Sequence, residues 1–227
     1  MASAFDGLLP PSVACEDLSG LSAAREDELC DVLPPSERAV VAGAVAQRRR
    51  EFAAVRHAAR RALSRLGRPA GVILPGTDRA PRWPAGVVGS MTHCPGFRAA
   101  AVALDRDAAS LGIDAEPHAP LPDGVHDLIL AGEERAMLAE LAGERRGCAM
   151  DRVLFSAKES IYKAWYPLTG RWLGFDDCEV TFDGNAFVGG VLIEPAVVGG
   201  TVVARFHGRW AIRDGIVLTA VHVPRPG

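Results

Sequence analysis

Residues 155–165 read FSAKESIYKAW. Apolar residues recur through this stretch and its flanks at spacings of three and four, which predicts a helix with one buried face. The opposite side of this helix carries Glu159 and Lys163, which are one helical turn apart. Taken alone, such a pair indicates no more than a weak ion pair on an exposed helix surface.

The same stretch holds both lysines of the chain, Lys158 and Lys163, although the protein has 25 basic residues in all. A lysine ammonium is a compact point charge, whereas the guanidinium of arginine is a planar fork. A crowded anionic site favours the ammonium. The placement of the two lysines therefore suggests that they face a phosphate or a group of carboxylates.

Composition narrows the classes of function. The chain has 227 residues, 48% of them hydrophobic, and a net charge of −3, so no global basic field draws it to nucleic acid or to an anionic membrane. Five scattered cysteines without a Cys-x-x-Cys pair argue against a disulfide framework or a structural zinc site. We expect a soluble cytoplasmic protein, because neither a signal peptide nor a long apolar run is visible.

The first part of the chain predicts helices followed by a hairpin. Residues 1–36 are rich in proline, with a short helix expected at 23–30. Ser36 is expected to cap a long helix that breaks once before Leu66. Strands are expected at 86–93 and 97–104, joined by a Pro-Gly turn.

The second part begins with a strand at 111–118 and two short amphipathic segments between 120 and 140. Asp151 is expected to cap the central helix, which should end near Trp165 because Pro167 and Gly170 follow. Beyond Phe175 the pattern alternates, and it predicts a mostly antiparallel sheet.

Basic residues follow the long N-terminal helix. Arg49, Arg56 and Arg60 line one flank of it, and Arg48 lies on the other side. A solvated basic face would explain this row without any ligand. The alternative is a seat for a phosphate dianion, which the forked guanidinium matches well.

Three further candidates lie at strand ends. His93 stands at the mouth of the hairpin, where it is either structural or a hydrogen-bond donor to a phosphate. The neighbouring Cys94 has no recognisable base, so a thiol nucleophile is not indicated. Asp114 and Glu116 share one face of their strand, because strand side chains alternate. They are either a solvated pair or hard oxygen ligands for Mg²⁺ beside substrate phosphates.

Taken together, these motifs carry a family resemblance. Residues 112–116, GIDAE, followed about 40 residues later by 155–163, FSAKESIYK, resemble the Sfp-type 4′-phosphopantetheinyl transferases. Residues 92–98, 114–118 and 165–174 look most like the bacterial branch of enterobactin synthetase component D. The likeness covers roughly residues 48–177, and the paired motifs are far more specific than either motif alone.

The resemblance implies a fold of class α+β with pseudo-twofold symmetry, although no internal sequence repeat is visible. Each half would pack a small, mainly antiparallel sheet on a long helix, with residues 1–109 forming the N-terminal half and 110–227 the C-terminal half. The active site would lie in the cleft between them. A monomer is expected.

The resemblance also implies a reaction. The enzyme would transfer 4′-phosphopantetheine from coenzyme A to a serine of an acyl or peptidyl carrier protein and release adenosine 3′,5′-bisphosphate. Mg²⁺, or Mn²⁺ in its place, would be the cofactor. The carriers could serve fatty acid, polyketide, nonribosomal peptide or siderophore biosynthesis, and the sequence does not choose among them.

Each residue role comes from the same likeness. The implied metal ligands are Asp114, Glu116 and Glu159, and the implied catalytic residues are Glu159, Lys163 and Asp114. Glu159 would also help to deprotonate the serine. The implied coenzyme A contacts are Arg48, Arg56, Arg79, His93, Lys158 and Lys163.

Two rival interpretations stay open at this point. One is another Mg²⁺-dependent phosphoryl-transfer enzyme or phosphohydrolase that acts without a carrier protein. The other is a catalytically silent binding or scaffolding module, which the presence of all three acidic positions and both lysines disfavours.

Overall fold

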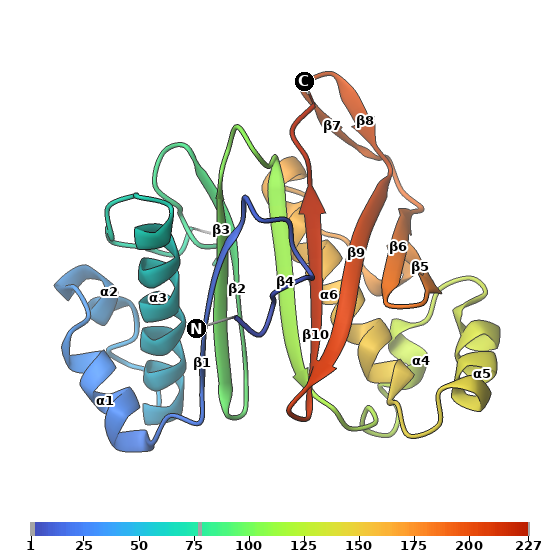
Figure 1. The fold of residues 1–227 in the computed structure, drawn as a ribbon, viewed down its shortest axis with the longest axis horizontal. Helices are drawn as coiled ribbons and strands as arrows, with labels where there is room; N and C mark the ends of the chain where they lie inside the picture. Colours follow the sequence, from blue (N-terminus) through green and yellow to red (C-terminus); the bar gives the residue numbers. More distant parts are fainter. Residues whose placement is uncertain (1–2, 77–78, 227) are drawn as a thin grey trace.

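Two sheets form the framework of the molecule (Figure 1). The computed structural model describes residues 3–76 and 79–226. The first sheet has the strand order β1-β3-β2, with β1 at Ala14–Ser19, β2 at Val87–Cys94 and β3 at Phe97–Leu104. Both pairings in this sheet are antiparallel.

The second sheet has the order β4-β10-β9-β6-β5 and is also antiparallel. Its strands are β4 (Ser110–Pro117), β5 (Cys178–Asp183), β6 (Ala186–Val191), β9 (Arg205–Arg213) and β10 (Ile216–Val223). A separate hairpin joins β7 (Ala196–Val198) to β8 (Thr201–Val203). The predicted antiparallel C-terminal region is confirmed, and the chain is an α+β protein.

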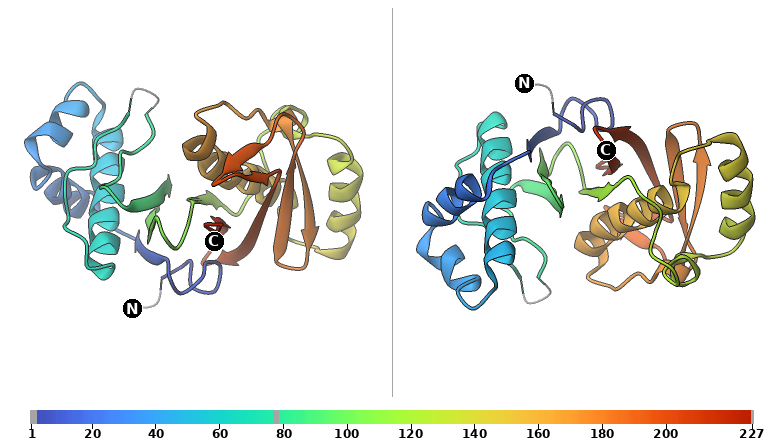
Figure 2. Two further views of the ribbon diagram at one scale, coloured as in Figure 1. Left: turned by 90° about the horizontal axis from the view of Figure 1, so that it is seen from above. Right: turned by 90° about the horizontal axis from the view of Figure 1, so that it is seen from below.

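A 20-residue helix packs on each sheet, α3 (Ala46–Arg65) on the first and α6 (Met150–Thr169) on the second. The shorter helices flank these two (Figures 1 and 2). They are α1 (Ala23–Asp31), α2 (Pro35–Val40), α4 (His126–Ile129) and α5 (Glu134–Glu144), and a 3₁₀ turn spans Phe175–Asp177. Two sheet-plus-helix halves result, as expected from the resemblance.

The N-terminal helices differ in detail from the prediction. The expected break exists, because α2 and α3 are separate helices. Ser36, however, lies inside α2, which begins one residue earlier at Pro35. Proline is well suited to a first helical position, where its missing N–H would have had no partner. The strand β1 was not predicted at all, because residues 14–19 show little alternation.

The central helix runs further than predicted. It passes through Pro167 and ends at Thr169, and the cap residue Gly170 has a φ of 64°. Proline removes one helical hydrogen bond, but the last turn keeps others: the Gly170 N–H donates to the Tyr166 carbonyl at 2.8 Å, and the Thr169 hydroxyl donates to the Trp165 carbonyl at 3.1 Å. At the other end the cap is Ala149, so the prediction of Asp151 as the cap is wrong.

The seam between the two halves uses hydroxyl groups in place of carbonyls. The backbone N–H of Ile113 on β4 donates to the Ser90 hydroxyl of β2, and that of Ala115 donates to the Thr92 hydroxyl, both at 3.0 Å. On its other side β4 lies against α6, and a Cβ at Gly112 would sit 1.8 Å from the Ser160 carbonyl oxygen. Glycine therefore allows β4 to approach α6 closely.

The first residues of the chain cross this seam. Phe5 and Leu8 are buried in a cluster that also contains Leu218 and Ala220 of β10. Arg213 at the end of β9 donates to the carbonyls of residues 4 and 6, both at 2.7 Å. In Figure 1 the segment runs from β1 to β10 and back. We call residues 3–13 the N-terminal strap.

Candidate active site

Asp114 is the most firmly held carboxylate of the predicted site. It lies on β4 and is 4% exposed. Its Oδ1 accepts from the Thr92 hydroxyl at 3.1 Å and from Lys163 Nζ at 2.7 Å, and its Oδ2 accepts from the Ser156 hydroxyl at 2.8 Å. Three elements, β2, β4 and α6, therefore fix its orientation.

Glu116 follows on the same strand and is partly buried. Its Oε2 accepts from Arg152 Nη1 of α6 at 2.9 Å. Burial raises the pKa of the Glu116 carboxyl; the charge of Asp114 adds to the increase, and Arg152 opposes it. The two carboxylates of β4 therefore lie in each other's electrostatic field.

Glu159 on α6 belongs to the same field. Burial raises the pKa of its carboxyl, Lys163 lowers it, and Asp114 raises it further. Glu159 and Lys163, which the sequence alone would assign to a weak ion pair on the surface, are thus partly buried near Asp114. The ammonium of Lys163, one turn further along α6, lies 2.7 Å from Asp114 Oδ1.

The donor chemistry of this group fits Mg²⁺. Within residues 3–76 and 79–226, no three His, Cys, Asp or Glu side chains form a ready metal cage. Mg²⁺ does not need one, because it is usually held by one or two carboxylates, waters and substrate phosphates. Asp114 and Glu116 supply such oxygens, and their negative charges repel each other. A bound divalent cation would offset this repulsion.

A second cluster lies at the end of β2. Arg48 Nη1 is 3.2 Å from His93 Nε2, and His93 Nδ1 is 3.8 Å from Glu51 Oε2. Because a guanidinium can only donate, Nε2 is the acceptor and the imidazole is neutral. Burial lowers the pKa of His93, and Arg48 lowers it further while Glu51 opposes the shift. The exposed Arg48 leaves this cluster open to an anion.

The arginine row does not form one open face. Arg56 is 5% exposed, its Nε donates to the Ile73 carbonyl at 2.9 Å, and its guanidinium lies 3.2 Å from the centre of the Phe52 ring. Burial lowers its pKa to about 10, with the nearby charges of Arg48 and Arg60 adding to the decrease. Arg60 pairs with Glu37 at 2.9 Å. The row is therefore neither a continuous solvated face nor one shared phosphate-binding site, because Arg56 and Arg60 have structural partners.

Lys158 is separate from the site. It is 3% exposed, and its ammonium donates to the carbonyls of Ile129 and Phe175 at 2.7 and 2.6 Å and lies 2.8 Å from Glu134 Oε2. Three acceptors use all three of its protons. The structure therefore contradicts the prediction that Lys158 contacts coenzyme A phosphates; the turn of α6 that carries it faces the core.

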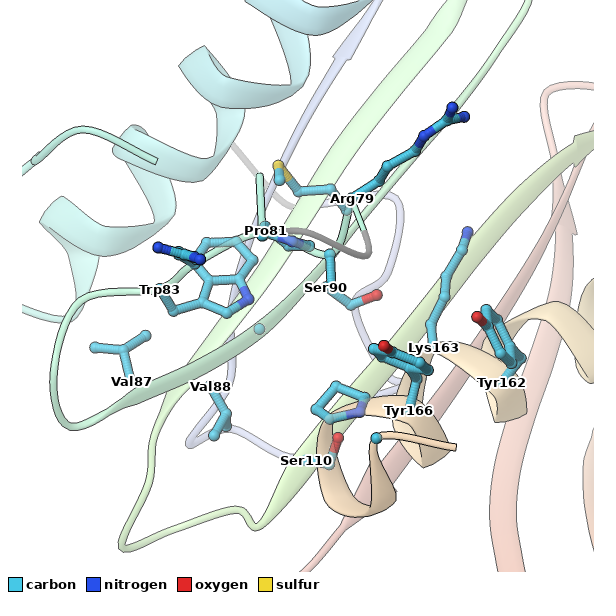
Figure 3. A pocket seen from close by; sticks show the side chains of 17 residues that line it. Arg79, Pro81, Trp83, Val87, Val88, Ser90, Ser110, Tyr162, Lys163 and Tyr166 are labelled. Carbon is cyan, nitrogen blue, oxygen red and sulfur yellow. The ribbon is translucent and has the colours of Figure 1, made fainter. Parts of the chain in front are cut away.

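A cleft of about 720 Å³ opens beside Lys163 (Figure 3). One wall comes from β2 and the loop before it, and includes Arg79, Pro81 and Trp83. The facing wall comes from α6, with Tyr162, Lys163 and Tyr166. Arg79 has a φ of 69°, an uncommon conformation for a residue other than glycine. Lys163 is the residue that joins this cleft to the carboxylates.

Some contacts of the site could not be read from the sequence. Thr92 and Ser156 orient Asp114, and Arg152 holds Glu116. The one local signal for Thr92 is its position next to His93. Ser156 and Arg152 had no signal of their own, because single serines and arginines on a helix are common on solvated faces.

Comparison with known proteins shows which family the chain resembles. Residues 36–103 match the 4′-phosphopantetheinyl transferase N-terminal domain, and residues 110–195 match the 4′-phosphopantetheinyl transferase superfamily. The chain is 55% identical over 202 residues to 4′-phosphopantetheinyl transferase Svp of Streptomyces mobaraensis, which covers 88% of this chain and 82% of Svp. Among residues 3–76 and 79–226, no helix is long and apolar enough to cross a membrane.

Two other relatives are similar over most of their length. The chain is 47% identical to 4′-phosphopantetheinyl transferase Npt of Nocardia iowensis, covering 82% of this chain and 87% of Npt. It is 46% identical to 4′-phosphopantetheinyl transferase PptT of Mycobacterium tuberculosis, covering 82% and 84%. The chain therefore belongs to the 4′-phosphopantetheinyl transferases, enzymes that transfer phosphopantetheine from coenzyme A to carrier proteins.

Proposed function

We propose that the cleft between β2 and α6 binds coenzyme A and that the carboxylates beside it are the reaction centre. The observation that carries this assignment is the position of Lys163. Its ammonium lies 2.7 Å from Asp114 Oδ1, and the same side chain lines the cleft. A substrate phosphate at this end of the cleft would meet the carboxylates and a cation together.

In this proposal the chain's residues position groups and move a proton. The serine oxygen of the carrier attacks the phosphorus that bears the pantetheine arm, and the bond to the other phosphate breaks, so that adenosine 3′,5′-bisphosphate leaves. Glu159, whose pKa burial raises, takes the serine proton directly or through water. Lys163 neutralises the charge that develops on the phosphate. Phosphoryl transfer depends mainly on such positioning and charge neutralisation.

The metal assignment follows from donor chemistry. Asp114, Glu116 and Glu159 would hold Mg²⁺, or Mn²⁺ in its place, and the ion when bound would neutralise the pyrophosphate. Asp114 Oδ2 accepts from Ser156 in the structure, and a carboxylate oxygen has two lone pairs, so it has capacity for a further partner.

The second cluster, formed by Arg48 and His93, is proposed to bind the 3′-phosphate of coenzyme A. Arg48 Nη1 and His93 Nε2 lie 3.2 Å apart. Arg79 supplies another cation on the cleft wall. The forked guanidinium of Arg48, which meets solvent, suits a 3′-phosphate.

Other parts of the interpretation stay proposals. We propose a division at residues 109 and 110, supported by β3 and β4 belonging to different sheets. A cytoplasmic monomer is our expectation. The closer likeness to enterobactin synthetase component D also stays an expectation. The relatives compared above are actinobacterial proteins and do not test it. The carriers served stay open, and a panel of carriers from each pathway would identify them.

The main test incubates the protein with coenzyme A, Mg²⁺ and a panel of apo carrier proteins, and measures carrier mass. We expect one phosphopantetheine on the carrier serine and none with Asp114→Ala at any Mg²⁺ concentration. The control is Asp183→Ala, which removes an exposed carboxylate at the end of β5. Substantial transfer by Asp114→Ala would refute the metal assignment, and hydrolysis of coenzyme A without carrier labelling would favour a phosphohydrolase.

A second test concerns the 3′-phosphate. Arg48→Ala should weaken the use of coenzyme A far more than the use of its 3′-dephospho form. Arg48 is preferable to Arg56 here, because loss of the buried Arg56 would also disturb the core. Arg50→Ala on the same helix, which pairs with Asp27 instead, is the matched control. Equal losses with both substrates would show that Arg48 does not contact the 3′-phosphate.

A further inference from the structure

Arg152 contacts a proposed metal ligand, yet neither the motifs nor the reaction above gives it a role. Its Nη1 donates to Glu116 Oε2 at 2.9 Å, its Nε to the Ala119 carbonyl at 3.0 Å and its Nη2 to the Pro120 carbonyl at 3.0 Å. Every nitrogen of the guanidinium thus has a partner on β4 or in the segment that follows it. The side chain is only 14% exposed, so its geometry is strongly constrained.

Glu116 needs such a partner for a physical reason. It is two residues from Asp114 on the same strand face, so the two negative charges repel each other. A glutamate side chain also has three rotatable bonds, and β4 ends at Pro117, directly after it. Without a cation behind it, the carboxylate would be expected to turn away from Asp114 into solvent.

The contact occupies only one side of the carboxylate. Arg152 bonds Oε2, while among the hydrogen bonds of the described residues none falls on Oε1. One oxygen is therefore held and the other is free to accept a cation. This differs from Asp114, both of whose oxygens accept from neighbouring side chains.

We propose that Arg152 is a positioning residue that holds Glu116 beside Asp114 in the orientation that binds the metal ion. The inference rests on the proposed function, in which Glu116 is a metal ligand. Arg152 itself touches neither the substrate nor the ion. Removing it should weaken metal binding and leave the chemical step nearly intact once metal is saturating.

The test is Arg152→Gln, with two readouts. Mn²⁺ binding to the free protein, followed by electron paramagnetic resonance, should weaken about 10-fold to 100-fold, the range typical when a group that orients a metal ligand is lost. In the transfer assay the Mg²⁺ concentration for half-maximal rate should rise by a similar factor, while kcat at saturating Mg²⁺ stays near that of the unaltered protein. Arg152→Lys keeps the charge but not the fork, so it should recover part of the affinity.

Arg171→Gln is the matched control. Arg171 also bonds one carboxylate and two carbonyls, to Glu194 Oε2 at 3.2 Å and to the carbonyls of Glu194 and Pro195 at 2.6 and 3.1 Å. Its loss should disturb a loop to a similar degree and leave metal binding unchanged. An equal change in both variants would mean that the effect of Arg152 is general destabilisation.

Glu116→Gln separates this inference from the proposed function. If Glu116→Gln weakens Mn²⁺ binding and a folded Arg152→Gln does not, the positioning role is wrong while the metal site stands. If Glu116→Gln leaves Mn²⁺ binding unchanged, the ligand assignment itself fails. In the double variant we expect no greater loss than in Glu116→Gln alone; fully additive losses would overturn the coupling. Should Arg152→Gln fail to fold, the same comparisons apply to Arg152→Lys.

Discussion

Both halves of the molecule bury a glutamate beside their long helix, but different cations neutralise the two glutamates. In the N-terminal half, Glu37 of α2 is fully buried. Its two oxygens each lie 2.9 Å from Arg60 Nη1 of α3, and Oε1 also accepts the Ile73 N–H at 2.6 Å. The side chain of Arg60 is 17% exposed, so part of its guanidinium remains hydrated.

The C-terminal half repeats the arrangement with lysine. Glu134 at the start of α5 accepts the N–H groups of Ala131 and Val180, both at 2.7 Å, and pairs with Lys158 of α6. Burial raises the pKa of the Glu134 carboxyl, and its three partners oppose that increase. Here both charged side chains are almost completely buried.

The difference shows what selects the cation. A guanidinium has five N–H donors and would leave some of them unpaired in a closed pocket, whereas an ammonium has three donors and meets three acceptors at Lys158. At the partly open position of Arg60, water can satisfy the remaining donors. The two lysines of the chain therefore have separate explanations. The closed pocket explains Lys158, and the anionic site explains only Lys163.

Breaking the C-terminal pair should have the largest effect. Lys158→Met leaves the carboxylate of Glu134 buried without its cation, and we expect a loss of about 3–5 kcal/mol in the free energy of unfolding. Urea denaturation measures it. Transfer activity per folded molecule should fall much less than stability.

The same variant tests whether Lys158 contacts coenzyme A. If Lys158→Met is as stable as the unaltered protein but uses coenzyme A poorly, Lys158 contacts the substrate after all. Glu37→Gln breaks the ion pair of the other half from the opposite side, by removing its negative charge. Its amide oxygen can still accept the Ile73 N–H and Arg60 can turn to water, so we expect a loss of only about 1–2 kcal/mol.

Exchanging the cations should give an intermediate effect. Lys158→Arg places a larger, forked group in a closed pocket and should cost about 1–3 kcal/mol through overpacking. Arg60→Lys sits at a rim that water reaches, and it should cost less than about 1 kcal/mol. Thermal denaturation of the two variants compares them directly; equal losses would show that the donor count does not select the cation.

The smallest expected effect concerns one histidine in each half. Burial lowers the pKa of His57 on α3 below its usual value of 6.5, with Arg61 adding to the decrease, and burial also lowers that of His222 on β10. Each imidazole binds a proton more readily in the unfolded chain. Stability should therefore be complete above about pH 6.5 and should decline as the pH falls below that value.

Denaturation curves at pH 7.5 and 5.5 test this dependence, with His57→Gln and His222→Gln as the variants. Each variant should lose less stability between the two pH values than the unaltered protein does. A larger loss in either variant would contradict the lowered pKa of the histidine that it replaces.

The sequence signals for the proposed reaction centre are local. Asp114 and Glu116 stand two apart on a strand, and Glu159 and Lys163 stand one turn apart on a helix; both spacings fix a shared face. The paired motifs then predicted the α+β fold and the family. Strand β1 gave no such signal, since its burial depends on α3 and β3, which are distant in sequence.

The errors arose where tertiary contacts decide a side chain's environment. The motif predicted that Lys158 contacts a phosphate, but it could not show that Glu134 and two carbonyls enclose the ammonium. Similarly, Arg56 belongs to a basic row in sequence and to the core in space. The partner of Glu116 comes from 36 residues away, which no local pattern reports.

The N-terminal strap has a consequence for how the protein unfolds. Residues 3–13 join the N-terminal half through the chain but bury Phe5 and Leu8 against both halves, and Arg213 of the other half holds their backbone. Neither half can lose its structure without exposing apolar surface on the other. Heating should therefore produce one cooperative transition, and deletion of the strap should separate it into two.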